Sequence, residues 1–150
     1  MVPGQTLLSR LGTLLAADTG TLASATLAVK VHLASATFNP SLGLLVGSFT
    51  EATFAGYAAI TGTVGAQQLF TDPLTAQQTI QLAAPAGGWH WATTTAVGLP
   101  QTIFGWWVSD NGNTVVYGSG LFPTPFLLTA AGQGVDIGFL RWEVLLTALQ

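Results

Sequence analysis

Two histidines and six carboxylates are the side chains of this 150-residue chain that best suit acid–base or metal chemistry. The histidines are His32 and His90, and no Asp or Glu lies within four residues of either. Metal ions need clustered ligands, so this isolation favours a structural or surface role for each imidazole. The alternation around His32 places its ring on the outward, wetter face of a strand. We expect no metal site.

Nucleophilic chemistry is equally poorly supported. No Gly-x-Ser-x-Gly motif occurs, and the spacing places no serine near a histidine. The turn Asp110–Asn113 lacks the ligand alternation and the closing Glu of a calcium loop. The carboxylates considered for glycoside hydrolysis stand singly among neutral neighbours, at Glu51, Asp72, Asp110, Asp136 and Glu143. Gly118–Gly120 and Gly132–Gly134 separate predicted strands and have no helix behind them to bind phosphate. We therefore expect no enzyme, no catalytic residue and no cofactor.

The composition narrows the classes of partner. Only 6% of the residues are charged and the net charge is −3, whereas an ordinary domain carries about 25% charged residues. Three basic residues (Arg10, Lys30 and Arg141) cannot track a phosphate backbone, which argues against nucleic-acid binding. No apolar run is long enough to predict a membrane span, and 49% hydrophobic residues are enough for a folded core. The start of the chain does not resemble a secretory signal, and the absence of cysteine excludes disulfides and thiolate sites.

The small number of charged residues also predicts that the protein assembles with other subunits. Soluble proteins keep apart through net charge, and they protect exposed strand edges with Lys, Pro or inward-pointing charges. This chain has one lysine. We infer that much of its surface is covered by other subunits, and we expect a homo-oligomer, a trimer or larger.

A short amphipathic helix is predicted at the start of the chain, over Thr6–Ala17. Its leucines follow a 3.6-residue period and form one stripe, which docks either on the protein's own sheet or on a neighbouring subunit. These stripe residues are candidate interface residues: Leu7, Leu8, Leu11, Leu14 and Leu15.

After Ser24 the hydrophobic period becomes two, which predicts strands. Leu27–Leu33 alternates, and Thr102–Val108 and Thr114–Tyr117 flank an Asn-Gly turn of the type found in hairpins. Pro123 and Pro125 confine Leu121–Leu128 to an edge or a bend, and Val135–Leu146 is predicted as one long last strand.

The predicted fold is therefore all-β, mainly an antiparallel sandwich or barrel of jelly-roll type, with one short N-terminal helix. We expect a single β domain over residues 1–150, with the helix or arm in 1–24 and the β-sandwich in 25–150.

Tryptophans are the other notable feature. Trp89 and Trp91 lie on one face of a strand with His90 opposite, whereas Trp106 and Trp107 must point to opposite faces. The outward member of the second pair is covered by another layer of the protein, by a subunit interface, or by a sugar stacked on its ring. Trp106 and Trp107 are thus candidate interface residues.

The sequence around Glu51 predicts a structural clasp, by which we mean a loop over Thr50–Tyr57 that is anchored to the core. In Thr50–Tyr57, Gly56 suits a bend into a strand, and Phe54 and Tyr57 would anchor the loop to the core. Glu51 is the one charge in a long neutral stretch, and we expect it to accept backbone N–H bonds within that loop.

The segment Thr50–Tyr57 and the strand Gly105-Trp106-Trp107-Val108-Ser109-Asp110 both resemble segments of a known group of proteins, and the resemblance extends over most of the chain. The sequence Ser48-Phe49-Thr50-Glu51-Ala52-Thr53-Phe54-Ala55-Gly56-Tyr57-Ala58 resembles a segment found in small proteins encoded among tailed-phage and prophage structural genes. Relatives often carry a basic residue after that segment, where this chain has Ala59.

The resemblance implies a virion structural protein, made in the host cytoplasm and located in the virion. It would be a capsid decoration (cement) protein or a small tail or fibre component, with itself and other virion proteins such as a capsid lattice as partners. Two alternatives stay open: a glycan-binding module that uses its tryptophans, and a self-assembling fibre subunit unconnected to a virus.

Overall fold

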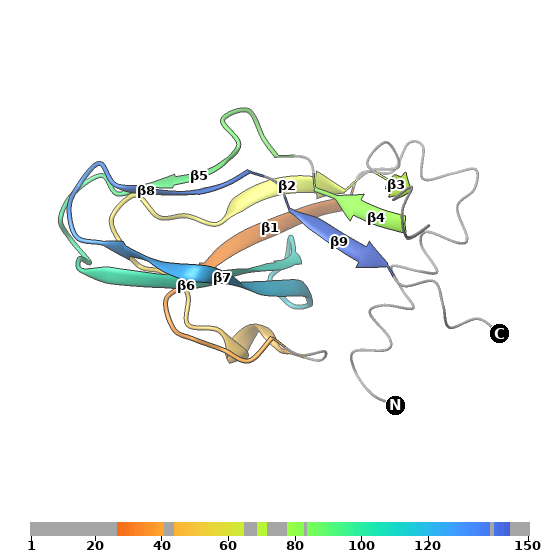
Figure 1. Ribbon diagram of the computed structural model, residues 1–150, viewed down its shortest axis with the longest axis horizontal. Coiled ribbons are helices and arrows are strands. Elements are labelled where there is room, and N and C mark those ends of the chain that lie inside the picture. The colour runs from red at the N-terminus through yellow and green to blue at the C-terminus, as the bar shows by residue number, and fades with distance from the viewer. Residues whose placement is uncertain are drawn as a thin grey trace.

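The structure is a computed structural model, and it describes residues 27–40, 44–64, 69–71, 78–82, 84–138 and 140–144. Its regular elements are antiparallel strands and one 3₁₀ turn, η1 (Val46–Ser48), so the all-β prediction is confirmed (Figure 1). The helix expected over Thr6–Ala17, with its leucine stripe, lies outside the described residues.

A four-stranded sheet forms the centre of the described part, in the order β2-β1-β6-β7. Its strands are β1 (Leu27–Ala34), β2 (Ile60–Val64), β6 (Gln101–Asp110) and β7 (Val116–Leu128). The predicted alternation in β1 is confirmed on its apolar face, because Val29, Val31 and Leu33 are fully buried. Branched and aromatic side chains favour this pleated, half-buried setting.

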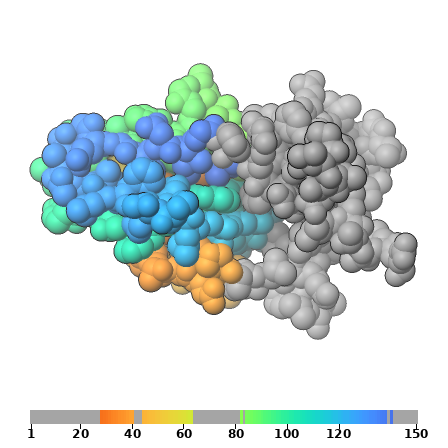
Figure 2. Space-filling model, viewed as in Figure 1, coloured from red at the N-terminus to blue at the C-terminus, as the bar shows by residue number. Residues whose placement is uncertain are grey.

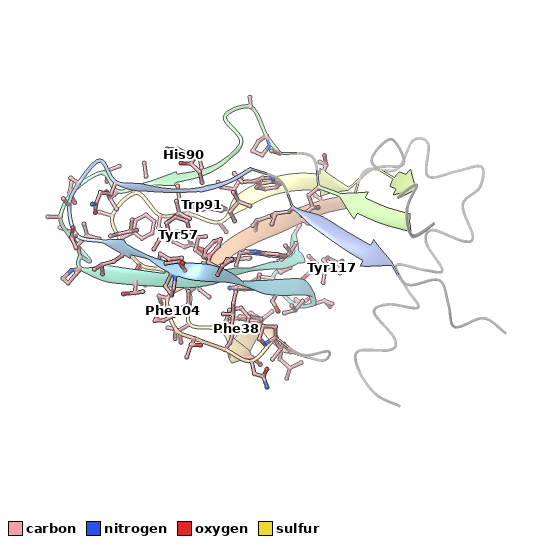
Figure 3. All side chains as sticks on the ribbon, in the orientation of Figure 1. Phe38, Tyr57, His90, Trp91, Phe104 and Tyr117 are labelled. Carbon is pink, nitrogen blue, oxygen red and sulfur yellow. The ribbon has the colours of Figure 1, made fainter. Side chains whose placement is uncertain are left out.

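A two-stranded ladder packs on one face of this sheet. It consists of β5 (Trp89–Ala92) and β8 (Gly134–Ile137), with Trp91 paired to Val135. Trp89 and Trp91 share one face of β5 with His90 opposite, as predicted, and this face is buried: the two tryptophans join Val31 and Leu33 in one core. Figure 3 shows Trp91 and Tyr57 between the two layers, while His90 points away from them.

The last predicted strand is two strands in different sheets. β8 pairs with β5, whereas β9 (Arg141–Val144) pairs with β4 (Gln78–Gln81), which also pairs with β3 (Leu69–Thr71). The chain bends at Gly138 between them, and Leu140 then enters the core. The prediction of one long strand over Val135–Leu146 is therefore wrong.

The β6–β7 hairpin is confirmed, but its turn differs from the expected one. Asn113, with φ of 56°, is the residue of the turn that adopts positive φ; Gly112 does not. The carboxylate of Asp110 organises the turn instead, accepting hydrogen bonds from the backbone N–H groups of Gly112, Thr114 and Val115 at 2.6–3.1 Å. A side-chain acceptor has replaced the two left-handed residues that an Asn-Gly turn usually supplies.

Candidate functional site

The four-stranded sheet has two differently covered faces. Trp106 and Trp107 point to opposite faces, as predicted, and Trp106 packs against the core beneath β5 and β8. Trp107 lies on the other face and is only 1% exposed, although it is not part of the core. The segment that contains η1 passes below this second face in Figure 1.

An aromatic stack covers the second face. The indole of Trp107 stacks on the imidazole of His32, with ring centroids 3.8 Å apart, and on the ring of Phe49 at 4.8 Å. Phe38 meets Phe49 edge-on. The outward tryptophan is thus covered by another layer of its own chain, and it offers no exposed anchor for a subunit or a sugar.

The stack encloses a buried histidine. His32 lies on the face opposite the core residues of β1, as predicted, but it is only 2% exposed, so the prediction that this face is the wetter one is wrong. Its Nδ1 lies 2.7 Å from Oε1 of Glu51, and its Nε2 lies 3.0 Å from Oγ of Ser109. The spacing of the sequence indicated neither of these contacts. Both partners are distant in sequence and arrive through strand pairing.

Glu51 joins this histidine to the predicted clasp. The hydroxyl of Tyr57 donates to Oε1 of Glu51 at 2.7 Å and accepts the backbone N–H of Leu33 at 3.1 Å. The carboxylate therefore accepts from two side chains, and the prediction that it serves backbone N–H groups of its own loop is wrong. A backbone bridge between Ala34 and Glu51 fixes the same contact.

The clasp residues otherwise behave as predicted. Phe54 is buried in the core, and Tyr57 packs against it edge-on. Gly56 has φ of +94°, and a Cβ at this position would lie 2.6 Å from the carbonyl oxygen of Ala92. Only glycine fits such a close approach with this backbone geometry. The segment Thr50–Tyr57 thus fastens the loop to both β1 and the chain after β5.

Burial shifts the protonation of His32 toward the neutral imidazole. Loss of hydration lowers the pKa of His32 below its ordinary value of 6.5, although the hydrogen bond and the negative charge of Glu51 act in the opposite direction. Burial likewise raises the pKa of Tyr57 far above its ordinary value. In the neutral form, Nδ1–H of His32 donates to Glu51, and Nε2 is free to accept the hydroxyl proton of Ser109.

Hydroxyl, imidazole and carboxylate in this order form the arrangement that activates serine nucleophiles. Here, however, Ser109 is 0% exposed, and the carbonyl oxygen of Asp110, 2.9 Å from its Oγ, competes with Nε2 of His32 for the single hydroxyl proton. A nucleophile must reach the reacting atom of its substrate. The arrangement is therefore better suited to cross-linking β1, β6 and the clasp than to attacking a substrate.

The second histidine forms a contrasting pair. Nδ1 of His90 lies 2.5 Å from Oδ1 of Asp136, across the β5–β8 ladder, and both side chains are well exposed. Asp136 is therefore not solitary either. Exposed pairs of this kind contribute little to stability because water screens their charges.

The outer strand β7 is the second candidate site. It is the outermost described strand on one side of the four-stranded sheet, and among the described strands it pairs with β6 alone. Its exposed apolar side chains are Leu121, Phe126 and Leu127, and Leu127 is 60% exposed. Pro123 and Pro125 lie where residues 122–125 bulge opposite Phe104 alone. The prediction of an edge with a bend is confirmed for this segment, which lies at the surface of the face shown in Figure 2.

The described residues show no cluster of three or more His, Asp or Glu side chains that could hold a metal ion, and no helix long and apolar enough to span a membrane. Comparison with protein-family models, with curated proteins and with solved structures finds no match to this chain. Function must therefore be inferred from the geometry.

Proposed function

We propose that this protein is a structural subunit that acts by assembling with copies of itself and with other proteins of a particle. The observation that carries the proposal is the exposed apolar edge formed by β7. It lies within a stretch, residues 111–135, that contains no charged side chain. Edge strands without charge can pair with other chains, and in β7 the protection against such pairing is confined to Pro123, Pro125 and the bulge at residues 122–125.

The fold supports an architectural role. The β5–β8 ladder packs on the four-stranded sheet through buried tryptophans, which favours a jelly-roll-like sandwich in preference to a barrel. The described polar groups that could do chemistry are either engaged with one another, as in the His32 network, or exposed singly. What the surface offers is apolar area, and its burial drives association.

The particle we propose is a virion, with the protein as a capsid decoration protein or a small tail or fibre component. The support for this is the resemblance of the Ser48–Ala58 segment to phage structural proteins. The genes that flank the coding sequence test it. Genes for a portal or a major capsid protein would support the virion, whereas metabolic neighbours would overturn it and leave only the assembly proposal.

Sedimentation velocity tests the assembly proposal. We expect an oligomer at micromolar concentration, and we expect Leu127→Lys to shift it strongly toward monomer because the lysine charge must be desolvated at the interface. Val97→Lys is the matched control, since Val97 is 72% exposed but lies in the loop before β6. A wild-type monomer at all concentrations, or equal dissociation by both variants, would overturn the proposal.

The tryptophans on which the glycan-binding alternative depended are buried. Trp89, Trp91 and Trp107 are each at most 2% exposed, so they present no face on which a sugar ring can stack. Titration with oligosaccharides while tryptophan fluorescence is recorded remains the direct test, and an emission shift would favour the module over the structural subunit.

A further inference from the structure

The Asn-Gly pair in the β6–β7 turn combines an exposed side-chain amide with an unshielded backbone nitrogen. Asn111 and Gly112 are both exposed. Among the described residues, no hydrogen bond holds the side-chain amide of Asn111. Gly112 has no side chain to shield its backbone nitrogen. This nitrogen can therefore approach Cγ of Asn111, the carbonyl carbon of the preceding side chain.

Such an approach permits a reaction within the chain that consumes water and releases ammonia. The nitrogen of Gly112 loses its proton to solvent base and forms a bond to Cγ of Asn111, and the bond from Cγ to Nδ2 breaks as ammonia leaves with a proton from solvent. The product is a five-membered succinimide ring. Water then opens the ring at either carbonyl by breaking its bond to the Gly112 nitrogen, which leaves aspartate or isoaspartate in place of Asn111.

The carboxylate of Asp110 opposes the first step while the turn is folded. Its Oδ2 lies 3.1 Å from the nitrogen of Gly112 and accepts its N–H. Loss of hydration acts to raise the pKa of Asp110, but the hydrogen bonds that the group accepts within the turn outweigh this and hold the pKa below its ordinary value. Asp110 is therefore negatively charged at neutral pH, and this charge disfavours the amide anion that must form on Gly112. The hydrogen bond must also break before the nitrogen can turn toward Cγ.

The other two asparagines of the chain lack this combination, so they serve as internal standards. Asn39 precedes Pro40, whose nitrogen carries no proton to lose. Asn113 precedes Thr114, whose branched side chain hinders the attack and whose N–H donates to the same carboxylate at 2.6 Å. The contrast singles out Asn111.

We propose that Asn111 is a site of spontaneous deamidation through a succinimide with Gly112, and that the Asp110 carboxylate slows this reaction while the hairpin turn is folded. The inference goes beyond the proposed function and does not depend on it. The product places a second negative charge beside Asp110, in the stretch 111–135 that otherwise carries none. Isoaspartate also lengthens the backbone of the turn by one carbon, which disturbs the alignment of the N–H groups that donate to Asp110.

Mass spectrometry of the aged protein tests the site. The purified chain is held in neutral buffer at physiological temperature and digested with pepsin, and each asparagine-containing peptide is followed for a gain of one dalton. We expect conversion at Asn111 to be at least tenfold faster than at Asn39 or Asn113, with separate aspartate and isoaspartate peptides. Conversion of Asn111 in the folded chain that is no faster than that of the other two overturns the site.

Gly112→Ala is the matched variant for the site. Gly112 does not have positive φ, and the nearest atoms to the added Cβ belong to the side chains of Asp110 and Thr114. We expect the added methyl group to slow conversion of Asn111 at least tenfold by hindering the attack. An unchanged rate would show that the Gly112 nitrogen is not the attacking group, which overturns the succinimide route.

Asp110→Asn tests the restraint, because it removes the charge but keeps a side-chain carbonyl that can accept from the turn. We expect the folded variant to convert Asn111 several-fold faster than the wild type. In concentrated guanidinium chloride the two rates should become similar, and both should exceed that of the folded wild type, because the turn that brings Asp110 to Gly112 is lost.

If Asp110→Asn does not fold, as judged by its thermal transition, the wild type with and without denaturant carries this test. A folded wild-type rate equal to the rate in denaturant, or a folded Asp110→Asn no faster than the wild type, overturns the restraint by Asp110.

Discussion

The His32 face of the sheet and the β7 edge differ in how far the chain covers its own side chains, although the buried Nε1 of Trp107 on the first has no hydrogen-bond partner. On the His32 face, Glu51, Tyr57 and Ser109 supply partners for the imidazole, and Trp107 and Phe49 cover it. On the β7 edge, apolar side chains stay exposed, and β6 is the described strand that pairs with β7.

This difference separates internal structure from candidate function. A buried polar network stabilises the fold only when its members are all paired, so changes there should act on stability. An exposed apolar edge adds nothing to the isolated fold, so changes there should act on assembly. The variants described next test whether changes on the His32 face alter stability without altering assembly.

The largest effect on stability is expected at Gly56. Gly56→Ala places a Cβ 2.6 Å from the carbonyl oxygen of Ala92 in a residue with φ of +94°. The backbone must therefore shift to relieve the clash, and the alanine must also adopt a strained positive φ. We expect a loss of about 3–5 kcal/mol in the free energy of unfolding, measured by urea denaturation.

Gly87→Ala is the control for Gly56→Ala. Gly87 also has positive φ, +103°, but nothing lies within 4 Å of its Cβ position. This variant carries the backbone strain alone, about 1–2 kcal/mol. Equal losses for the two variants would show that the clasp is not tightly packed against Ala92.

The next largest effect is expected at Glu51. Glu51→Ala removes the acceptor of both the His32 Nδ1–H and the Tyr57 hydroxyl. Each stranded donor costs about 1–3 kcal/mol, and partial exposure of the Glu51 site lets water offset some of this. We expect a loss of about 2–3 kcal/mol by thermal or urea denaturation, without dissociation of the oligomer.

A smaller effect is expected from pH. The folded state holds His32 at a pKa below 6.5, so the unfolded state binds more protons as the medium becomes acidic. Stability should be complete above pH 6.5 and should fall as the pH drops below it, by at most about 1.4 kcal/mol per pH unit for one proton. His32→Gln should flatten this part of the profile. An unchanged slope in His32→Gln would mean that another group carries it.

The smallest effect is expected at the exposed pair. Asp136→Ala removes the carboxylate that His90 contacts at 2.5 Å, yet we expect a change below about 0.5 kcal/mol because both groups face water. Comparison with Glu51→Ala is the useful measurement. Similar losses in the two variants would contradict the division between a satisfied interior and a solvated surface.

Local features were readable from the sequence because they depend on neighbouring residues. Alternation predicted β1 and the shared face of Trp89 and Trp91, and the Asn-Gly turn predicted the β6–β7 hairpin. Gly56 and Phe54 in the clasp were predicted for the same reason, since a bend and an aromatic anchor are local signals.

The His32 network was missed because it is not local. Glu51 is 19 residues from His32, and Ser109 is 77 residues away. The β1–β6 register, which pairs His32 with Trp107 and Lys30 with Ser109, brings Ser109 to the imidazole, and the bridge between Ala34 and Glu51 brings the carboxylate. A lone Glu before the Phe-x-Gly-Tyr segment was the available signal, and its partner could not be identified until the strands were paired.

Hydrogen exchange at different protein concentrations tests the central claim, that a second copy covers the β7 edge, most directly. We expect amides of β7 to become more protected as the concentration rises from nanomolar to micromolar, while β5 and β8 exchange at unchanged rates. Exchange in β7 that does not depend on concentration, in a chain that remains folded, would contradict the account.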